Sequence, residues 1–204
     1  MKNLQPVILA AGHALRFGSN KILQKLPNNL PIIRHIAETV LEAAFVFPPV
    51  IVTRVDDHLL QAALAGLEIQ YVDNPDAHLG ISTSLQKGLR HLASGADAAL
   101  IVLGDQPFIT AALLQKLNGL YQESGAQIVY PQVGGRRSNP VILDRSVFPA
   151  AMALRGDTGA KSLPPGFTIA TLDWLDARLP LDADTPQDYE RILAAWSAGT
   201  KSTH

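Results

Sequence analysis

Val7-Ile8-Leu9-Ala10 is an apolar run that leads directly into AGHALRFGSNK at positions 11–21. A short run that is apolar throughout is typical of a strand covered on both faces of a sheet. Similar runs, rich in Val and Ile, recur along the chain and alternate with longer amphipathic segments. This alternation favours βαβ units and therefore an α/β fold with a mostly parallel sheet. The predicted strands are 7–10, 50–53, 69–72, 98–103 and 128–130, and the predicted helices are 32–47, 57–64, 82–93 and 111–123.

The alternation changes after position 130. The sequence GGRRSNP at 134–140 lies between two short apolar stretches and predicts a hairpin or loop. Ser82 and Thr110 precede helical patterns, so each is predicted to cap free helical N–H groups. A helix at 146–154, strands at 167–172 and 178–181, and a last helix at 187–196 after Pro186 complete the prediction. We expect one domain at 1–197 and a frayed tail at 198–204.

Composition excludes several classes of protein. Of the 204 residues, 47% are hydrophobic and 17% are charged, and the net charge is −1, which favours a folded globular chain over a disordered one. The near-neutral charge argues against a dedicated nucleic-acid binder. The absence of cysteine excludes disulfide frameworks, cysteine–zinc sites and thiol catalysis. No stretch approaches the roughly 20 apolar residues of a membrane span. We therefore expect no nucleic-acid partner, no membrane and a cytoplasmic location.

The segment after the first strand carries two glycines and two cations. Gly12 and Gly18 would let backbone N–H groups approach phosphate oxygens, and Arg16 and Lys21 could neutralise their charge. The spacing is not that of a Walker loop, because Lys21 lies three residues after Gly18, and it is not GxGxxG, because His13 is followed by Ala14. The alternative interpretation is a glycine-containing βα turn with surface cations.

A second signal ends the fourth predicted strand, in Leu103-Gly104-Asp105-Gln106-Pro107. An ionised carboxylate cannot point back into an apolar core without a large desolvation cost, so Asp105 is expected to face the crevice. There it could hold Mg²⁺, a cation usually bound by one or two carboxylates together with substrate phosphates. The alternative role of Asp105 is to cap the turn ahead of Pro107.

Taken together, these motifs resemble those of the MobA-like nucleotidyltransferases, most closely the molybdenum cofactor cytidylyltransferase branch. The resemblance rests on LAAG followed by R-x-G-x-x-K, and on LGDQP about 85 residues later. It spans roughly residues 5–195 in the family's order. The further motifs are NP at 74–75, GISTSL at 80–85, GRRSNPV at 135–141, GDTGAK at 156–161 and DADTPQD at 182–188.

The resemblance implies a Rossmann-like sheet flanked by helices, with a small antiparallel addition, as in nucleotide-diphospho-sugar transferases. It also implies Mg²⁺-dependent attack on the α-phosphate of a nucleoside triphosphate. The implied catalytic residues are Arg16, Lys21 and Asp105, and the implied metal ligands are Asp105 and Asp184. The implied nucleotide-binding residues are Leu9, Ala10, Ala11, Gly12, Arg16, Lys21, Gly80, Ser82 and Ser84, and the implied acceptor-binding residues are Asn139, Asp157 and Lys161.

The expected reaction transfers CMP from CTP to the phosphate of a molybdopterin-type cofactor and releases pyrophosphate, with an apo-molybdoenzyme as a further partner. Such an acceptor is already anionic, so alignment and charge neutralisation suffice and no serine, cysteine or histidine base is needed. Ala14, Leu15 and Asn139 depart from the family pattern. Two alternatives therefore stay open: transfer to another small phosphate, and nucleotide binding without catalysis.

Overall fold

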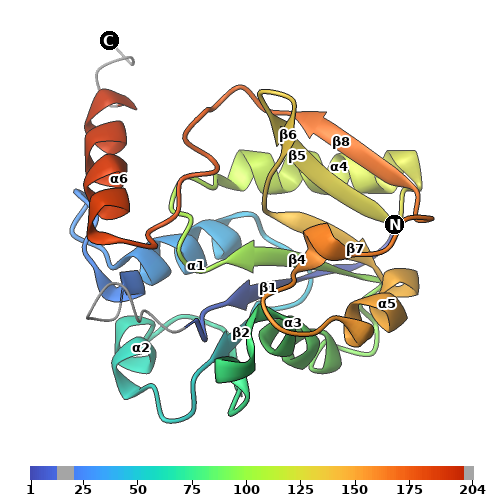
Figure 1. Cartoon of the computed structure of the whole chain (residues 1–204), viewed down its shortest axis with the longest axis horizontal. Coiled ribbons are helices and arrows are strands. Elements are labelled where there is room, and N and C mark those ends of the chain that lie inside the picture. The colour runs from blue at the N-terminus through green and yellow to red at the C-terminus, as the bar shows by residue number, and fades with distance from the viewer. Residues whose placement is uncertain (13–20, 200–204) are drawn as a thin grey trace.

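The computed structural model describes residues 1–12 and 21–199, and it contains one mixed sheet with helices on both faces (Figure 1). The strand order is β3-β2-β1-β4-β7-β5-β6, and β8 pairs with β5. The strands are β1 Leu4–Leu9, β2 Val50–Thr53, β3 Gln70–Asp73, β4 Ala98–Leu103, β5 Ile128–Val133, β6 Arg136–Arg137, β7 Val141–Asp144 and β8 Ile169–Asp173. The α-helices are α1 Ile32–Glu42, α2 His58–Ala63, α3 Ile81–Arg90, α4 Ala111–Ser124, α5 Phe148–Ala153 and α6 Pro186–Gly199.

The pairing confirms the predicted fold class. Strands β1 to β4 are mutually parallel neighbours, as βαβ units require. Strand β7 runs antiparallel to both β4 and β5, and β6 runs antiparallel to β5. The segment around GGRRSNP is therefore the small antiparallel addition to a Rossmann-like sheet.

Strands β1 and β4 lie in the middle of the sheet and are buried on both faces, as the apolar runs 7–10 and 98–103 predict, although β1 begins three residues earlier than predicted and includes the buried Gln5. Successive side chains of a strand point to opposite faces. Ile8 accordingly joins the cluster formed with α1 and α4, whereas Val7 and Leu9 join the cluster formed with α3 and α5. This two-sided burial fixes the register of the strands and hence the position of the residues that follow them.

Several predicted elements need correction. No strand forms at 178–181, because the segment folds into a local turn: Leu179 N donates to Asp176 O at 3.2 Å and Leu181 N donates to Arg178 O at 2.9 Å. These bonds use backbone groups that a strand would offer to a neighbour. Helix α1 also ends at Glu42, five residues before the predicted end.

Of the two predicted caps, Thr110 is confirmed and Ser82 is wrong. The Thr110 hydroxyl accepts from Leu113 N at 3.2 Å at the start of α4. Ser82 lies inside α3, whose N-cap is Gly80, and Ser82 N donates to Gly156 O at 3.2 Å. The backbone carbonyl of Gly156, in a neighbouring loop, therefore accepts from a free N–H group at the start of α3, which is the role that was predicted for the Ser82 hydroxyl.

Helix α6 begins at Pro186, one residue before the predicted start, and continues to Gly199, three residues beyond the predicted end. The first two residues of the predicted frayed tail, 198 and 199, thus belong to the helix, and 200–204 lie outside the described residues. Within residues 1–12 and 21–199, the structure has no helix that is both long and apolar enough to cross a membrane.

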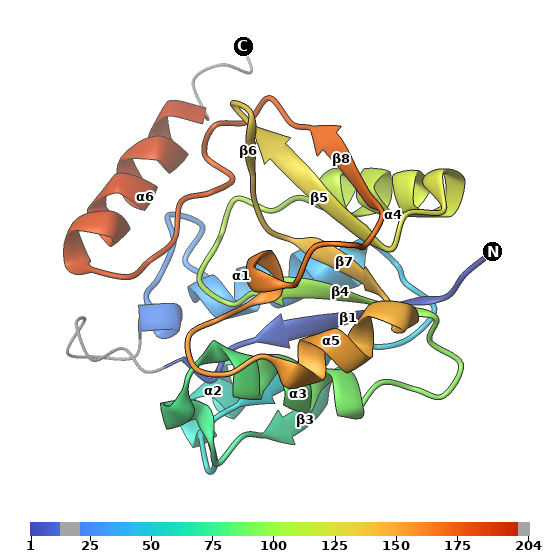
Figure 2. The ribbon, with the colours of Figure 1, turned by 45° about the vertical axis from the view of Figure 1, so that its right-hand side comes forward.

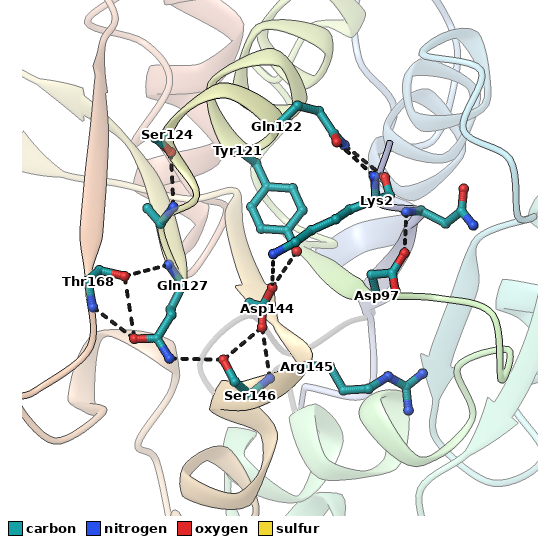
Figure 3. Close-up of polar contacts among 12 residues, drawn as sticks. Lys2, Asp97, Tyr121, Gln122, Ser124, Gln127, Asp144, Arg145, Ser146 and Thr168 are labelled. Atoms are coloured by element: carbon teal, nitrogen blue, oxygen red, sulfur yellow. Dashed lines mark hydrogen bonds and ion pairs between the residues drawn. The ribbon is translucent and has the colours of Figure 1, made fainter.

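A polar network joins Lys2, near the N-terminus, to Asp144 at the end of β7 (Figure 3). Its centre is Asp144, which accepts from Lys2 Nζ at 2.7 Å, Tyr121 Oη at 2.6 Å and Ser146 Oγ at 2.7 Å. Partial burial alone would raise the pKa of Asp144, but these donors outweigh it and hold the pKa well below the usual range. The ionised form of Asp144 is therefore the one that stabilises the fold.

We expect Asp144→Asn to lower the stability at pH 7 by about 1–2 kcal/mol, since hydrogen bonds to a charged acceptor are replaced by bonds to a neutral one. The native pKa of Asp144 is depressed, so its contribution is present above the ordinary value of 3.8 and is lost as pH falls through the native pKa. Thermal unfolding from pH 7 to 3 should show the difference between parent and variant shrinking below pH 4. A constant difference would contradict this, and Asp56→Asn, at an exposed position, is the control.

Candidate functional site

A pocket of about 490 Å³ opens at the carboxyl ends of β1 and β4. The arrowheads of both strands point to the side of the molecule where α6 stands (Figure 2). Ligands of open α/β sheets bind at this edge, because the loops that leave parallel strands gather there. The pocket is lined by ten of the residues that the sequence predicts: Leu9, Ala10, Ala11, Gly12, Lys21, Gly80, Ser84, Asp105, Asp157 and Asp184.

Two predicted nucleotide-binding residues are not in this group. Arg16 lies in the segment 13–20, outside the described residues. Ser82 is only 1% exposed and does not line the pocket. Ser82 instead lies in the first turn of α3, where its backbone N–H bonds to Gly156 O. No contact between the pocket and Ser82 supports its predicted role in nucleotide binding.

Lys21 bridges two of the acidic residues in the pocket. Its Nζ lies 2.7 Å from Asp105 Oδ2 and 2.5 Å from Asp184 Oδ1, and only 12% of its side chain is exposed. Burial alone would lower the pKa of Lys21, but the two carboxylates outweigh it and raise the pKa above its usual value. The ammonium therefore stays charged, and it joins the end of β4 to the segment before α6.

Asp182 also lines the pocket and was missed by the sequence analysis. Between it and Asp184 lies Ala183, which is fully buried and whose N–H donates to Asp105 O at 3.1 Å. Ala183 is thus buried, while the residues on either side of it, Asp182 and Asp184, line the pocket. The Asp-Ala-Asp spacing was the signal that could have identified Asp182.

Burial raises the pKa of Asp182 to about 6, and repulsion from Asp184 and Asp105 adds to the effect, whereas Lys21 opposes it. Burial is the largest of these causes, and among the described residues that line the pocket Lys21 is the one lysine or arginine beside the three carboxylates. Such a pocket disfavours a bare polyphosphate and favours one that arrives with cations.

Asp184 does not cap α6. The cap is Thr185, whose hydroxyl accepts from Asp188 N at 3.2 Å, while the Asp188 carboxylate accepts from Thr185 N at 3.0 Å. This reciprocal capping box satisfies the free N–H groups of the first turn. The Asp184 carboxylate is directed to Lys21 instead.

The hydroxyl of Ser84 is held by a buried amide. Asn74 is 2% exposed, and its Nδ2 donates to Ser84 Oγ and to Thr83 Oγ1, both at 2.9 Å. Its Oδ1 accepts from Asp76 N at 3.1 Å, which fixes the orientation of the amide. The loop after β3 thus orients a hydroxyl at the wall of the pocket.

A second hollow of about 260 Å³ adjoins the first and shares Leu9, Ile81, Leu103 and Asp157 with it. The three predicted acceptor-binding residues, Asn139, Asp157 and Lys161, all line this hollow. Its remaining walls are mainly apolar. The two groups of residues assigned to nucleotide and acceptor thus line neighbouring spaces that meet at Asp157.

Gly80 is the point of closest contact between the two sides. Its φ is 107°, and a Cβ at this position would lie 2.3 Å from the Gly156 carbonyl carbon. The chain at 156–157 can therefore approach the start of α3 only because position 80 has no side chain.

We expect Gly80→Ala to destabilise the protein by about 1–3 kcal/mol and to raise the KM for the acceptor, because the loop carrying Asp157 must move away. Gly159→Ala is the matched control for stability, since its φ is −108° and its Cβ would lie 4.0 Å from Ile81 Cγ2. Thermal unfolding and steady-state kinetics measure both effects. Unfolding temperatures that are equal for the two variants would contradict the expectation.

The described residues contain no group of three or more His, Asp or Glu side chains in a metal-binding arrangement. Asp105 and Asp184 nevertheless share one cation, the Lys21 ammonium. Carboxylate oxygens are the ligands that hard divalent cations prefer. This pair fits such a cation if the ammonium leaves.

Another pocket, of about 530 Å³, lies between α1 and α6 and includes His35, Phe108 and Trp196. It contains none of the predicted site residues. The side chain of His35 is fixed there, because its Nε2 lies 3.1 Å from Pro107 O, and burial lowers its pKa.

The chain is similar to known proteins in both sequence and fold. The model described as a MobA-like NTP transferase domain matches residues 6–165. The purine catabolism protein PucB of Bacillus subtilis (strain 168) is 28% identical over 211 residues, which cover 94% of this chain and 96% of that protein. Each of these likenesses extends over most of the chain.

Two crystal structures have similar folds. A homolog of Rv0371c from Mycobacterium sp. strain JC1 superimposes with a TM-score of 0.82 at 28% identity, over 96% of this chain and 97% of that one. A complex of Rv0371c with manganese from Mycobacterium tuberculosis H37Rv superimposes with a TM-score of 0.78 at 23% identity, over 95% and 99% of the two chains.

Proposed function

The chain belongs to the MobA-like NTP transferase family, and from this premise we propose that it transfers CMP from CTP to the phosphate of a molybdopterin-type cofactor and releases pyrophosphate. Nucleotidyl transfer is the activity of the family. The base, the acceptor and the use of Mg²⁺ are the proposed specifics. One observation carries the proposal: the Asp105–Lys21–Asp184 cluster lies at the carboxyl ends of β1 and β4, beside a hollow lined by Asn139, Asp157 and Lys161.

The proposed reaction is a substitution at the α-phosphorus of CTP. An oxygen of the acceptor phosphate forms a bond to the α-phosphorus of CTP, and the bond from that phosphorus to the oxygen bridging to the β-phosphate breaks. Pyrophosphate leaves with that oxygen and its electron pair. No proton has to be removed from an anionic acceptor, so the residues need only align two anions and reduce their repulsion.

Asp105 and Asp184 would hold the divalent cation, which supplies neutralisation of the triphosphate charge when bound. The manganese complex of a protein of the same fold is consistent with this assignment. Lys21 would contact the phosphates, and Arg16 would add a second positive charge from the segment outside the described residues. The acidic lining of the pocket favours this arrangement, since a nucleotide without cations would be repelled.

The backbone of Ala10 to Gly12 would lie against the nucleotide, and Gly80 and Ser84 would face its base and ribose. Asn74 supports this role, because it orients the Ser84 hydroxyl toward the wall of the pocket. On the other side, Asn139, Asp157 and Lys161 would receive the acceptor. An apo-molybdoenzyme that takes up the product is the further partner that this proposal includes.

Base preference is the prediction that separates this proposal from a guanine-specific one. Ala11 lines the pocket, and we propose that a Cβ at this position leaves less space for a purine base than a glycine would. Small volume differences in a pocket are worth about 1–3 kcal/mol, so we expect kcat/KM for CTP to exceed that for GTP by roughly 10- to 200-fold. Ala11→Gly should reduce this ratio without abolishing it.

The decisive measurement is pyrophosphate release with each of the four nucleoside triphosphates, with and without molybdenum cofactor. Release with CTP that depends on the cofactor supports the proposal. Equal or better use of GTP would overturn the cytidylyl assignment and leave nucleotidyl transfer intact. Release with a sugar phosphate or another small phosphate, and not with the cofactor, would overturn the acceptor. Nucleotide binding without release in any combination would favour a protein that has lost catalysis.

A further inference from the structure

The Lys21 ammonium lies between the two carboxylates that the proposed function assigns to the metal. It is 2.7 Å from Asp105 Oδ2 and 2.5 Å from Asp184 Oδ1, which are hydrogen-bonding distances to both at once. Each carboxylate therefore directs an oxygen at a cation that belongs to the chain itself. A divalent cation bound by both carboxylates would meet this ammonium, and like charges this close repel strongly.

The position of Lys21 in the chain keeps its side chain near the pair. The short helix Lys21–Leu23 is anchored by Ile22, which is 6% exposed within the main core. The Lys21 side chain is long and rotatable, so its ammonium can leave the carboxylates while the backbone stays in place. The pocket that Lys21 lines is the space into which it would turn.

Charge determines when this movement is favourable. Lys21 is the one lysine or arginine among the described residues that line the pocket, so without its ammonium these residues leave Asp105, Asp182 and Asp184 uncompensated, which is costly in a partly buried site. The ammonium can leave only when other charges replace both of its interactions. A nucleotide phosphate offers it a new anionic partner, and a divalent cation compensates the carboxylates.

We propose that the Lys21 ammonium and a divalent cation exclude each other at the Asp105–Asp184 pair, and that the nucleotide phosphates draw the ammonium away so that metal and nucleotide bind together. This inference rests on the proposed function, because it takes Asp105 and Asp184 as the metal ligands. Lys21 would thus prevent the pair from binding a divalent cation in the absence of nucleotide. It also makes metal and nucleotide binding mutually favourable, with the same coupling in both directions.

The test is binding of Mn²⁺ alone to the full chain, measured by electron paramagnetic resonance, in the parent, Lys21→Met and Lys25→Met. Lys25→Met is the matched control, since it removes the same charge from an exposed position four residues away. We expect Lys21→Met to bind free Mn²⁺ about tenfold or more tightly than the parent, and the control to match the parent. Lys21→Gln serves in the same way if the methionine variant does not fold.

The second measurement is the affinity for CTP in the presence of Mn²⁺ and the absence of acceptor, for which we expect the substitution to weaken binding. Lys21→Met should bind CTP more weakly than the parent, because a charge–phosphate contact is lost. The double variant Lys21→Met/Asp105→Asn should lose the gain in affinity for free Mn²⁺.

The outcomes separate this inference from the proposed function. If the parent binds Mn²⁺ through Asp105 and Lys21→Met binds it no more tightly, the exclusion of metal by Lys21 is overturned and the metal site stands. If Mn²⁺ binds none of the variants, with or without CTP, the metal site of the proposed function fails, and this inference fails with it.

Discussion

Asp105→Asn should lower kcat/KM for nucleotidyl transfer by about 100-fold or more while the protein stays folded. An amide is neutral and is a poorer ligand for a hard cation than a carboxylate is. The substitution keeps the shape of the side chain, and the backbone carbonyl of residue 105 still accepts from Ala183 N. The fold around the end of β4 should therefore be retained. Pyrophosphate release over a range of Mg²⁺ concentrations measures the loss.

The same measurement separates the catalytic role of Asp105 from that of a turn cap. If Asp105 only stabilised its turn, Asp105→Asn would keep near-normal turnover at limiting Mg²⁺ and show a lower melting temperature. Asp173→Asn, at an exposed position at the end of β8, controls for removal of one negative charge. Turnover that falls equally in the two variants would contradict the metal assignment.

The central part of the fold could be predicted because its signals are local. Strands buried on both faces are typically apolar, and the runs 7–10 and 98–103 in and around β1 and β4 show this in sequence. Pro186 marks the start of α6, because proline suits the first turn of a helix. The segment GGRRSNP interrupts the alternation of strand and helix and so predicts a hairpin or loop, whereas the antiparallel addition to the sheet is predicted by the family resemblance.

The errors came from contacts between distant segments and from backbone bonds that a pattern does not show. The apolar positions near 178–181 looked like a strand, but Asp176 pairs with Arg178 at 2.7 Å and closes a turn. Ser82 looked like a cap, but Gly156, more than 70 residues away in the chain, takes that place. Propensity could not reveal the contact with Gly156, because tertiary contacts override it, and the apolar pattern at 178–181 does not show the local bonds that close the turn.

Part of the candidate site could likewise be predicted from the sequence, and part of it could not. The carboxyl ends of neighbouring parallel strands must meet, so the approach of the LAAG and LGDQP segments followed from the predicted topology. The pairing of Lys21 with two carboxylates did not follow, because it depends on where the segment 176–185 returns to the sheet. Asp182 was missed for that reason, and its Asp-Ala-Asp spacing becomes informative once Ala183 is known to be buried.

The acidic segment before α6 allows one comparison in which two adjacent residues should give opposite results. Asp184→Ala removes a carboxylate that lies against Lys21, whereas Thr185→Ala removes the hydroxyl that caps the helix. If Asp184 holds the metal, its loss should slow transfer by roughly 100-fold and leave the stability almost unchanged. Loss of the Thr185 cap should lower the stability by about 0.5–2 kcal/mol and leave most of the turnover.

This pair of variants is informative because the two side chains share one stretch of backbone. A substitution that merely disturbed the segment would impair both stability and turnover, whichever residue was changed. A clean division requires that the carboxylate of Asp184 acts on the bound charges and that the hydroxyl of Thr185 acts on the helix. Chemical denaturation and single-turnover transfer with CTP measure the two effects separately. If Asp184→Ala kept its activity and lost stability, Asp184 would be a structural partner of Lys21, and Asp105 would remain as the metal ligand without it.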